Sequence, residues 1–86
     1  MEVTITIVGM AGSQSFSPSP ATVRVGQGVV WHNADSIAHT ATGSGFDTGV
    51  IDPGGTSAPI TFSATGSFPY QCTIHPTMTG ILTVTP

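Results

Sequence analysis

The feature that most constrains the fold of this chain is a series of short segments in which apolar and polar residues alternate, separated by glycine and proline. Near the amino terminus Val3, Ile5 and Ile7 alternate with threonines, and the segment 80–84 repeats the pattern near the carboxyl terminus. A period of two places the apolar side chains on one face of a strand. With seven or eight such segments and turn signals about every 8–12 residues, the sequence predicts an all-β fold, a small Greek-key sandwich or barrel.

The remaining segments fit the same fold. Pro18 and Pro20 cannot donate to a strand ladder, so the extended stretch 16–20 is expected at a sheet edge. The stretch 34–45 is irregular, and His39 lies in its middle. The other expected strands are 22–25, 29–33 with Val29, Trp31 and Asn33 on one face, 46–51, 57–62 with Ile60 and Phe62 inward, and 68–72 with Phe68, Tyr70 and Cys72 inward.

Length and composition exclude several classes of protein. Residues 1–86 are expected to form a single domain that buries only about 60–65% of its unfolded surface. Cys72 is the only cysteine, so disulfides cannot compensate for the small core, whereas a bound metal could. A net charge of −3 with one basic residue, Arg24, argues against nucleic acid or an anionic membrane as partner.

Targeting signals are also missing from the sequence. No apolar run reaches the ~20 residues that span a membrane, so insertion of this chain into a membrane is not expected. The strand pattern begins directly after Met1 and Glu2, and we find no signal peptide. We therefore interpret the sequence as a mature domain with an added initiator methionine, or as a domain cut from a longer chain.

The stretch 72–78, with the sequence Cys-Thr-Ile-His-Pro-Thr-Met, contains the strongest functional signal. It places a thiol, an imidazole and a thioether three residues apart each, in a loop short enough to surround one ion. Cysteine, two histidines and a weak axial methionine form the blue-copper electron-transfer site. We therefore predict one type 1 copper ion bound by His39, Cys72, His75 and Met78.

Other candidate residues have simpler interpretations. His32 points away from the face of Trp31 and is expected to face solvent. Met10 lies in a loop without a partner pattern and is interpreted as a surface apolar contact. Asp35 is interpreted as a residue that structures its loop, without a role at the metal. Trp31 is expected to pack between the sheets, and Tyr70 is interpreted as either a core residue or an electron relay.

The chain resembles the cupredoxins, the small blue-copper proteins that include plastocyanin, pseudoazurin and amicyanin. The matching stretches are 16–18 with 23–26, then 29–35 followed by His39, and the glycine-aromatic approach 66–72 to the cysteine. The spacing Cys-x2-His-x2-Met, with proline after the histidine and Gly80 two residues beyond the methionine, is most similar to the short loop of amicyanin.

The chain departs from the family pattern beside the ligands. Thr40 follows the first histidine, where the family commonly has Asn or Ser that braces the ligand loop, and Ala38 stands where plastocyanin-like members often have Pro. Ile74 replaces the proline of amicyanin and restores a backbone N–H. We expect the N–H groups of Thr40 and Ile74 to donate to the Cys72 sulfur, with Asn33 in the surroundings of the site.

The resemblance implies a carrier of single electrons, acting outside the cytoplasm, in the periplasm or on the outer side of a membrane. Electrons are expected to pass through the exposed edge of His75 to redox partner proteins, in small transient contacts below ~1,200 Å². The chain is expected to be a monomer. The apolar patch around His75 is predicted to comprise Met10, Ala11, Ile37, Ala38 and Pro76.

Other functions were weighed against this one. Multicopper oxidases need His-x-His pairs and a His-Cys-His run, which this sequence lacks, so the chain alone is not expected to be an enzyme. A structural zinc site is disfavoured because thioether is a poor zinc ligand. Two alternatives remain: a copper carrier or buffer without a redox role, and a cupredoxin module of a larger redox protein.

Overall fold

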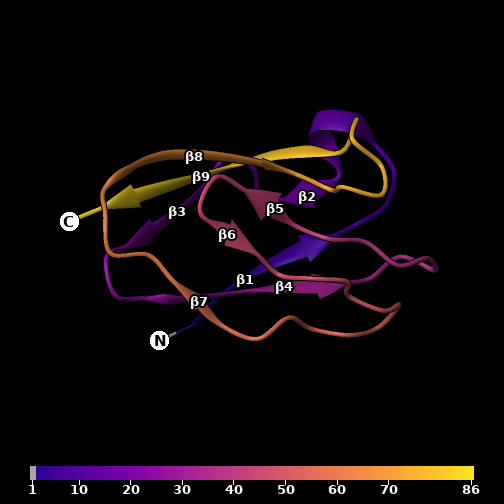
Figure 1. Cartoon of the computed structure of the whole chain (residues 1–86), viewed down its shortest axis with the longest axis horizontal. Helices are drawn as coiled ribbons and strands as arrows, with labels where there is room; N and C mark the ends of the chain where they lie inside the picture. Colours follow the sequence, from indigo (N-terminus) through magenta and orange to yellow (C-terminus); the bar gives the residue numbers. More distant parts are fainter. Residues whose placement is uncertain (1) are drawn as a thin grey trace.

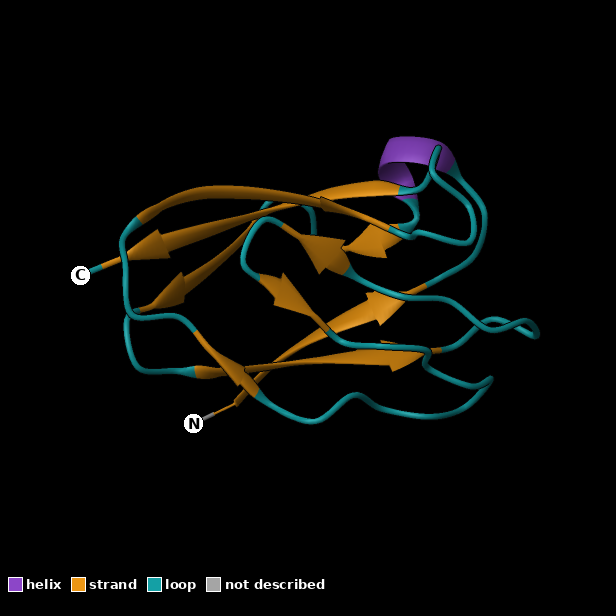
Figure 2. Cartoon of the chain, viewed as in Figure 1, coloured by secondary structure: helices purple, strands orange, loops and turns teal. Residues whose placement is uncertain are grey.

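Two β-sheets packed face to face make up this chain, of which the computed structural model describes residues 2–86 (Figures 1 and 2). The elements are β1 (Glu2–Ile7), the 3-10 turn η1 (Gly12–Gln14), β2 (Phe16–Ser17), β3 (Ala21–Arg24), β4 (Gly28–Asn33), β5 (Thr42–Gly43), β6 (Phe46–Asp47), β7 (Ile60–Thr61), β8 (Gly66–Gln71) and β9 (Thr79–Thr85). The predicted all-β sandwich is confirmed. Residues 2–86 contain nine strands rather than seven or eight, because the stretch expected to be irregular contributes β5.

Both sheets mix parallel and antiparallel pairs. The first has the strand order β2-β1-β4-β7, with β1 and β4 parallel, and the second has the order β3-β9-β8-β5-β6, with β3 and β9 parallel. The stretch 16–20 begins with the edge strand β2, as predicted, and its two prolines follow the paired residues. Two expected strands are shorter than predicted: only Phe46–Asp47 and Ile60–Thr61 pair as strands, while Ile51 forms an isolated bridge with His39.

The core lies between the sheets and follows the predicted period of two. Ile5, Ile7, Val29, Leu82 and Val84 are buried, together with Phe16, Ala21, Val23, Ala41, Ile51, Phe62 and Cys72. The Trp31 ring stacks on Phe46 with centroids 5.8 Å apart, and Tyr70 meets Trp31 edge-on at 5.5 Å. Trp31 and Tyr70 are therefore both parts of the core.

His32 departs from the expected pattern. It is half-buried rather than solvent-facing, because the segment before β7 covers this side of β4. Its Nδ1 atom lies 2.8 Å from Thr56 Oγ1, and the Ser57 N–H donates to the carbonyl of Trp31 at 2.8 Å. His32 is thus tied to a covering loop.

The strands β1, β4 and β8 all end on one side of the molecule, at the right of Figure 1. The loops that carry His39 and Cys72 leave the sheets there, from different strands of the sandwich. In the part of the chain that the structure describes, we find no helix with the length and apolar character of a membrane span.

Candidate metal centre

Cys72 lies directly after β8, at the end of the strand that passes through the core. Tyr70 and Cys72 face the same side, and the Cys72 side chain is fully buried. The loop that follows folds back on itself, because the Cys72 N–H donates to the Met78 carbonyl at 3.0 Å and the Met78 N–H donates to the His75 carbonyl at 2.9 Å. A seven-residue loop closed in this way holds its side chains in fixed directions.

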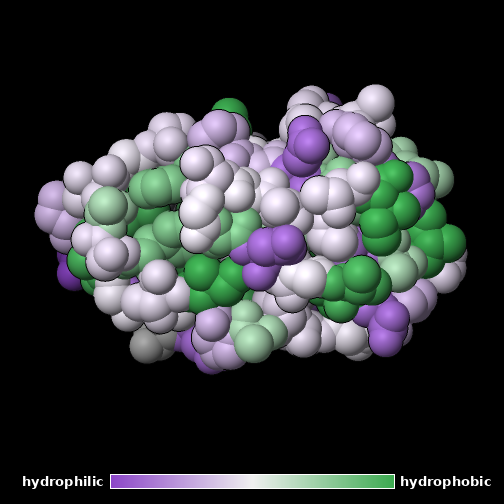
Figure 3. Space-filling model, viewed as in Figure 1, coloured by the Kyte–Doolittle hydropathy of each residue, from purple (hydrophilic) through white to green (hydrophobic). Residues whose placement is uncertain are grey.

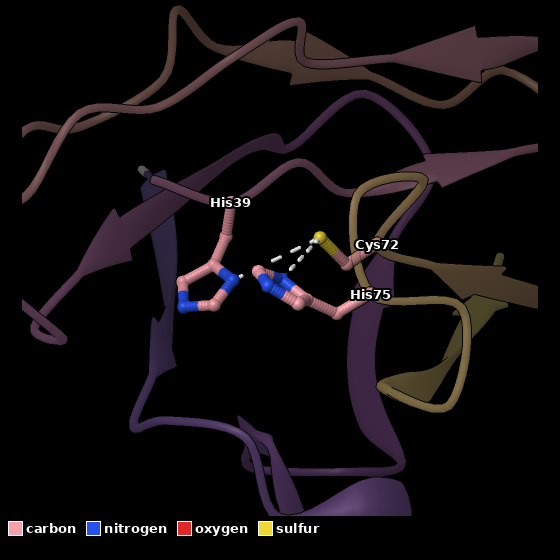
Figure 4. Close-up of side chains that lie close together, drawn as sticks. All are labelled: His39, Cys72 and His75. Carbon is pink, nitrogen blue, oxygen red and sulfur yellow. Dashed lines mark hydrogen bonds between the residues drawn. The ribbon is translucent and has the colours of Figure 1, made fainter. Parts of the chain in front are cut away.

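His39 reaches the same point from the other side. It pairs with Ile51 in both directions, with N–H to carbonyl distances of 3.2 and 2.7 Å, and its side chain is fully buried. Figure 4 shows the imidazoles of His39 and His75 directed at the Cys72 sulfur. The Nδ1 atom of each imidazole lies 3.8 Å from Cys72 Sγ, and the three donor atoms lie within 4.8 Å of one another.

These separations fit a shared metal ion. Metal–nitrogen bonds of about 2.0–2.1 Å and a metal–sulfur bond of about 2.3 Å, spread in a plane, leave nitrogen and sulfur roughly 3.8 Å apart. His39, Cys72 and His75 therefore have the spacing of a trigonal site. The thiolate and imidazole set, with a buried methionine in the same loop, is the donor chemistry of type 1 copper.

Met78 is the methionine that suits this site. It is fully buried at the end of the ligand loop, whereas Met10 is 62% exposed. His32, whose Nδ1 contacts Thr56, does not belong to the donor cluster.

The surroundings of Cys72 favour its thiolate. Burial by itself raises the pKa of the thiol, but the backbone N–H of Thr40, the His39 ring, the backbone N–H of His75 and the His75 ring together lower it to about 6. The Thr40 N–H lies 3.3 Å from the sulfur, as predicted. The His75 backbone N–H contributes to this lowering of the pKa, and the donation expected from the Ile74 N–H stays a prediction.

Asp35 has a role at the centre that the sequence interpretation missed. One carboxylate oxygen accepts the Ser36 N–H at 2.8 Å, as expected for a loop-structuring aspartate. The other lies 2.7 Å from Nε2 of His39. Because a carboxylate only accepts, Nε2 carries the proton and Nδ1 is left free to face the sulfur. The hydrogen bond from His39 is the main cause that lowers the pKa of Asp35.

The only signal for this contact in the sequence was an aspartate four residues before the histidine. Side chains four residues apart are neighbours on a helix, but in a loop this spacing predicts no contact.

Asn33 fixes the loop between these residues. Its buried amide donates to the carbonyls of Ile37 and Ile51 at 2.8 and 2.9 Å, and its oxygen accepts the Asp35 N–H at 3.0 Å. The expectation that Asn33 lies in the surroundings of the site therefore has a physical basis: this side chain sets the position of Asp35, which in turn orients His39.

Exposed apolar residues occur in the loops at the end of the molecule that carries His75. His75 is partly exposed, while His39 is not exposed at all. Figure 3 shows hydrophobic atoms gathered over the end of the molecule that carries these loops. All residues of the predicted patch are exposed or half-exposed, namely Met10, Ala11, Ile37, Ala38 and Pro76. Val8 and Ile74, which are 50% and 48% exposed, are further exposed apolar residues in these loops.

Known structures share this architecture. The purple cupredoxin from Nitrosopumilus maritimus is similar with a TM-score of 0.84 and 26% identity, over 96% of this chain and 99% of that chain. The chain has the cupredoxin fold. No family model matches its sequence, and no curated protein matches it either.

Two other proteins of known structure share this fold, one small and one much larger than this chain. A mutant of amicyanin in its Cu(I) form has a TM-score of 0.84 and 22% identity, over 98% of this chain and 82% of that chain, which shows the shared fold. The copper-containing nitrite reductase from Thermus scotoductus has a TM-score of 0.85 and 29% identity, over all of this chain but only 23% of that chain. The same fold therefore occurs in amicyanin and as one part of a copper-containing nitrite reductase.

Proposed function

We propose that this cupredoxin binds one type 1 copper ion through His39, Cys72, His75 and Met78 and carries single electrons between redox partners. The observation that supports this most directly is the spacing of one sulfur and two imidazole nitrogens as three possible donors to one ion, with both Nδ1 to Sγ distances at 3.8 Å. Copper held there supplies the exchange of one electron between Cu(II) and Cu(I).

The protein's part is to keep the donors in place during that exchange. His39 is held through Asp35, Asn33 and its pairing with Ile51, while Cys72 is held by the closed loop and by the Thr40 N–H. Donors fixed by the folded chain before an electron arrives have little to rearrange afterwards. Met78, buried at the end of the loop, would supply a weak thioether donor that tunes the potential.

Electrons would enter and leave through His75, the partly exposed imidazole. The apolar patch around it would provide a surface for brief contact with redox partner proteins. Such a complex would bury less than ~1,200 Å² of accessible surface. Because only 6% of the residues are charged, attraction between partners would depend little on charge.

We further propose that residues 1–86 act as a single domain outside the cytoplasm, as a monomer and without enzymatic activity of their own. The neighbours described above include both a small cupredoxin and one part of a nitrite reductase. An enzyme built on this domain would need a reaction site that further protein provides.

Addition of Cu(II) to the apo protein tests this function. We expect an intense blue thiolate-to-copper absorption and a reversible one-electron wave in voltammetry. His39→Ala should abolish the blue band, whereas His32→Ala, which changes a histidine outside the cluster, should retain it. A protein that binds only Cu(I), stays colourless and never cycles would instead be a copper carrier or buffer.

A further inference from the structure

A line of hydroxyl groups runs from the copper loop to a surface carboxylate. Thr73 Oγ1 lies 3.1 Å from Thr40 Oγ1, which lies 3.2 Å from Thr42 Oγ1. Thr42 Oγ1 donates to Asp47 Oδ1 at 2.9 Å. The chain thus links the residue after Cys72 to an exposed aspartate in β6 through two intervening threonines.

The carboxylate gives this chain one direction. A threonine hydroxyl has a single proton and two lone pairs, and a carboxylate can only accept. Since Thr42 gives its proton to Asp47, it must accept from Thr40. Thr40 has then used its own proton, so its oxygen accepts both the Thr73 hydroxyl and the Thr73 N–H, the latter at 3.0 Å. Each proton in the line points toward Asp47.

The inner end of this line connects the two ligand loops. Thr40 follows His39 and is 4% exposed, and its N–H donates to Cys72 Sγ. The Thr73 N–H, next to Cys72, donates to the Thr40 side chain. One threonine therefore joins both loops, and donation of its proton to Thr42 leaves both of its lone pairs to accept from Thr73.

The outer end of the line is also fixed. Asp47 faces Thr42 across the β5–β6 hairpin, and its Oδ1 atom accepts a second bond, from the Gly49 N–H at 2.8 Å. A negatively charged acceptor at the end of a hydrogen-bonded chain strengthens the bonds before it. The carboxylate is thus held where it polarises the hydroxyls.

We propose that Asp47 is a positioning residue for the copper loop, acting through Thr42 and Thr40 on Thr73 and Cys72. It orders the hydroxyl protons so that Thr40 accepts from the cysteine loop and holds the Cys72 sulfur against the Thr40 N–H. The consequence for copper depends on the proposed function, whereas the ordering of the Thr73 amide belongs to the protein chain itself.

Amide hydrogen exchange in the apo protein tests the chain directly. Asp47→Ala and Thr42→Val should each speed exchange of the Thr73 amide about fivefold, the factor for one lost hydrogen bond. The double variant should exchange no faster than either single one, since both break the same line. Asp52→Ala removes another exposed aspartate and should leave the exchange rate of the Thr73 amide unchanged. Thr42→Ser keeps the hydroxyl and should retain slow exchange.

The copper-loaded protein gives a second measurement. Asp47→Ala and Thr42→Val should alter the thiolate-to-copper absorption and lower the midpoint potential relative to Asp52→Ala, because a weaker N–H to sulfur bond stabilises the reduced site less. Normal Thr73 exchange in both variants, or the same change in Asp52→Ala, would overturn the proposal. A protein that fails to bind copper would refute the proposed function alone, because the apo exchange measurement still tests the chain.

Discussion

The contact between Gly80 and Tyr70 can be tested by adding one methyl group. Gly80 lies opposite Tyr70 in the β8–β9 pair, two residues after Met78. A Cβ atom at Gly80 would lie 2.6 Å from Tyr70 Cζ, 2.7 Å from its hydroxyl oxygen and 2.8 Å from Cε1. The Tyr70 ring cannot move aside, because it packs edge-on against Phe16 at 4.8 Å and Trp31 at 5.5 Å.

We therefore expect Gly80→Ala to destabilise the protein as an overpacked core does, by about 1–3 kcal/mol. For a domain of this length that lowers Tm by roughly 4–24 °C, which thermal unfolding of the apo protein followed by circular dichroism can measure. In the copper-loaded protein the blue absorption should also change, since Tyr70 is two residues from Cys72 in the same chain segment.

Gly28→Ala is the matched control. Gly28 also lies in a strand, but a Cβ there would meet only Glu2 Cγ and Pro59 Cβ at 3.5 Å, an ordinary contact. Alanine is favoured over glycine in a strand interior, so this variant should be as stable as the wild type or more so. If Gly80→Ala melts at the wild-type temperature with an unchanged spectrum, the packing of Tyr70 over Gly80 is not as described.

Three further predictions concern the site and its surface. Asp35→Asn should weaken copper binding about 10–100-fold in competition with a chelator, because it removes the carboxylate that orients His39; unchanged affinity would contradict that role. The folded pKa of Cys72 is about 6 against an ordinary value of 9.0, so the thiolate adds stability that is complete above pH 9 and lost as pH falls through 6. In urea unfolding of the apo protein, the free energy of unfolding should exceed that of Cys72→Ala by an amount that grows as the pH rises from 6 to 9. A difference that stays constant over this range would refute the role of the thiolate. Electron-transfer rates with a redox partner should vary little with ionic strength, and a steep fall with salt would show a charged docking surface instead.

Much of this protein could be predicted from local patterns. The alternation around Ile5, the prolines of 16–20 and the glycine turns predicted strands and edges, because period and turn chemistry are local properties of a chain. The Cys-x2-His-x2-Met spacing predicted three donors in one loop, because a loop of seven residues cannot separate them far. These parts needed no knowledge of distant contacts.

The sequence was less informative where covering loops decide burial. Nothing in the residues around His32 indicated that Thr56 would bond to it, and the stretch 46–51 contributes only a two-residue strand. Strand length in such regions depends on which backbone groups find partners across the sheet, which is a property of the assembled fold.

The fold class, the soft donor set and the shortage of charge follow from the residues alone, because each depends on which residues occur and how closely they follow one another. The meeting of His39 with Cys72, the hydrogen bond from His39 to Asp35, and the line from Thr73 through Thr40 and Thr42 to Asp47 became visible only in the folded chain. The physical reason is that hydrogen bonds depend on distance and direction, and only the folded backbone fixes these between residues far apart in the chain.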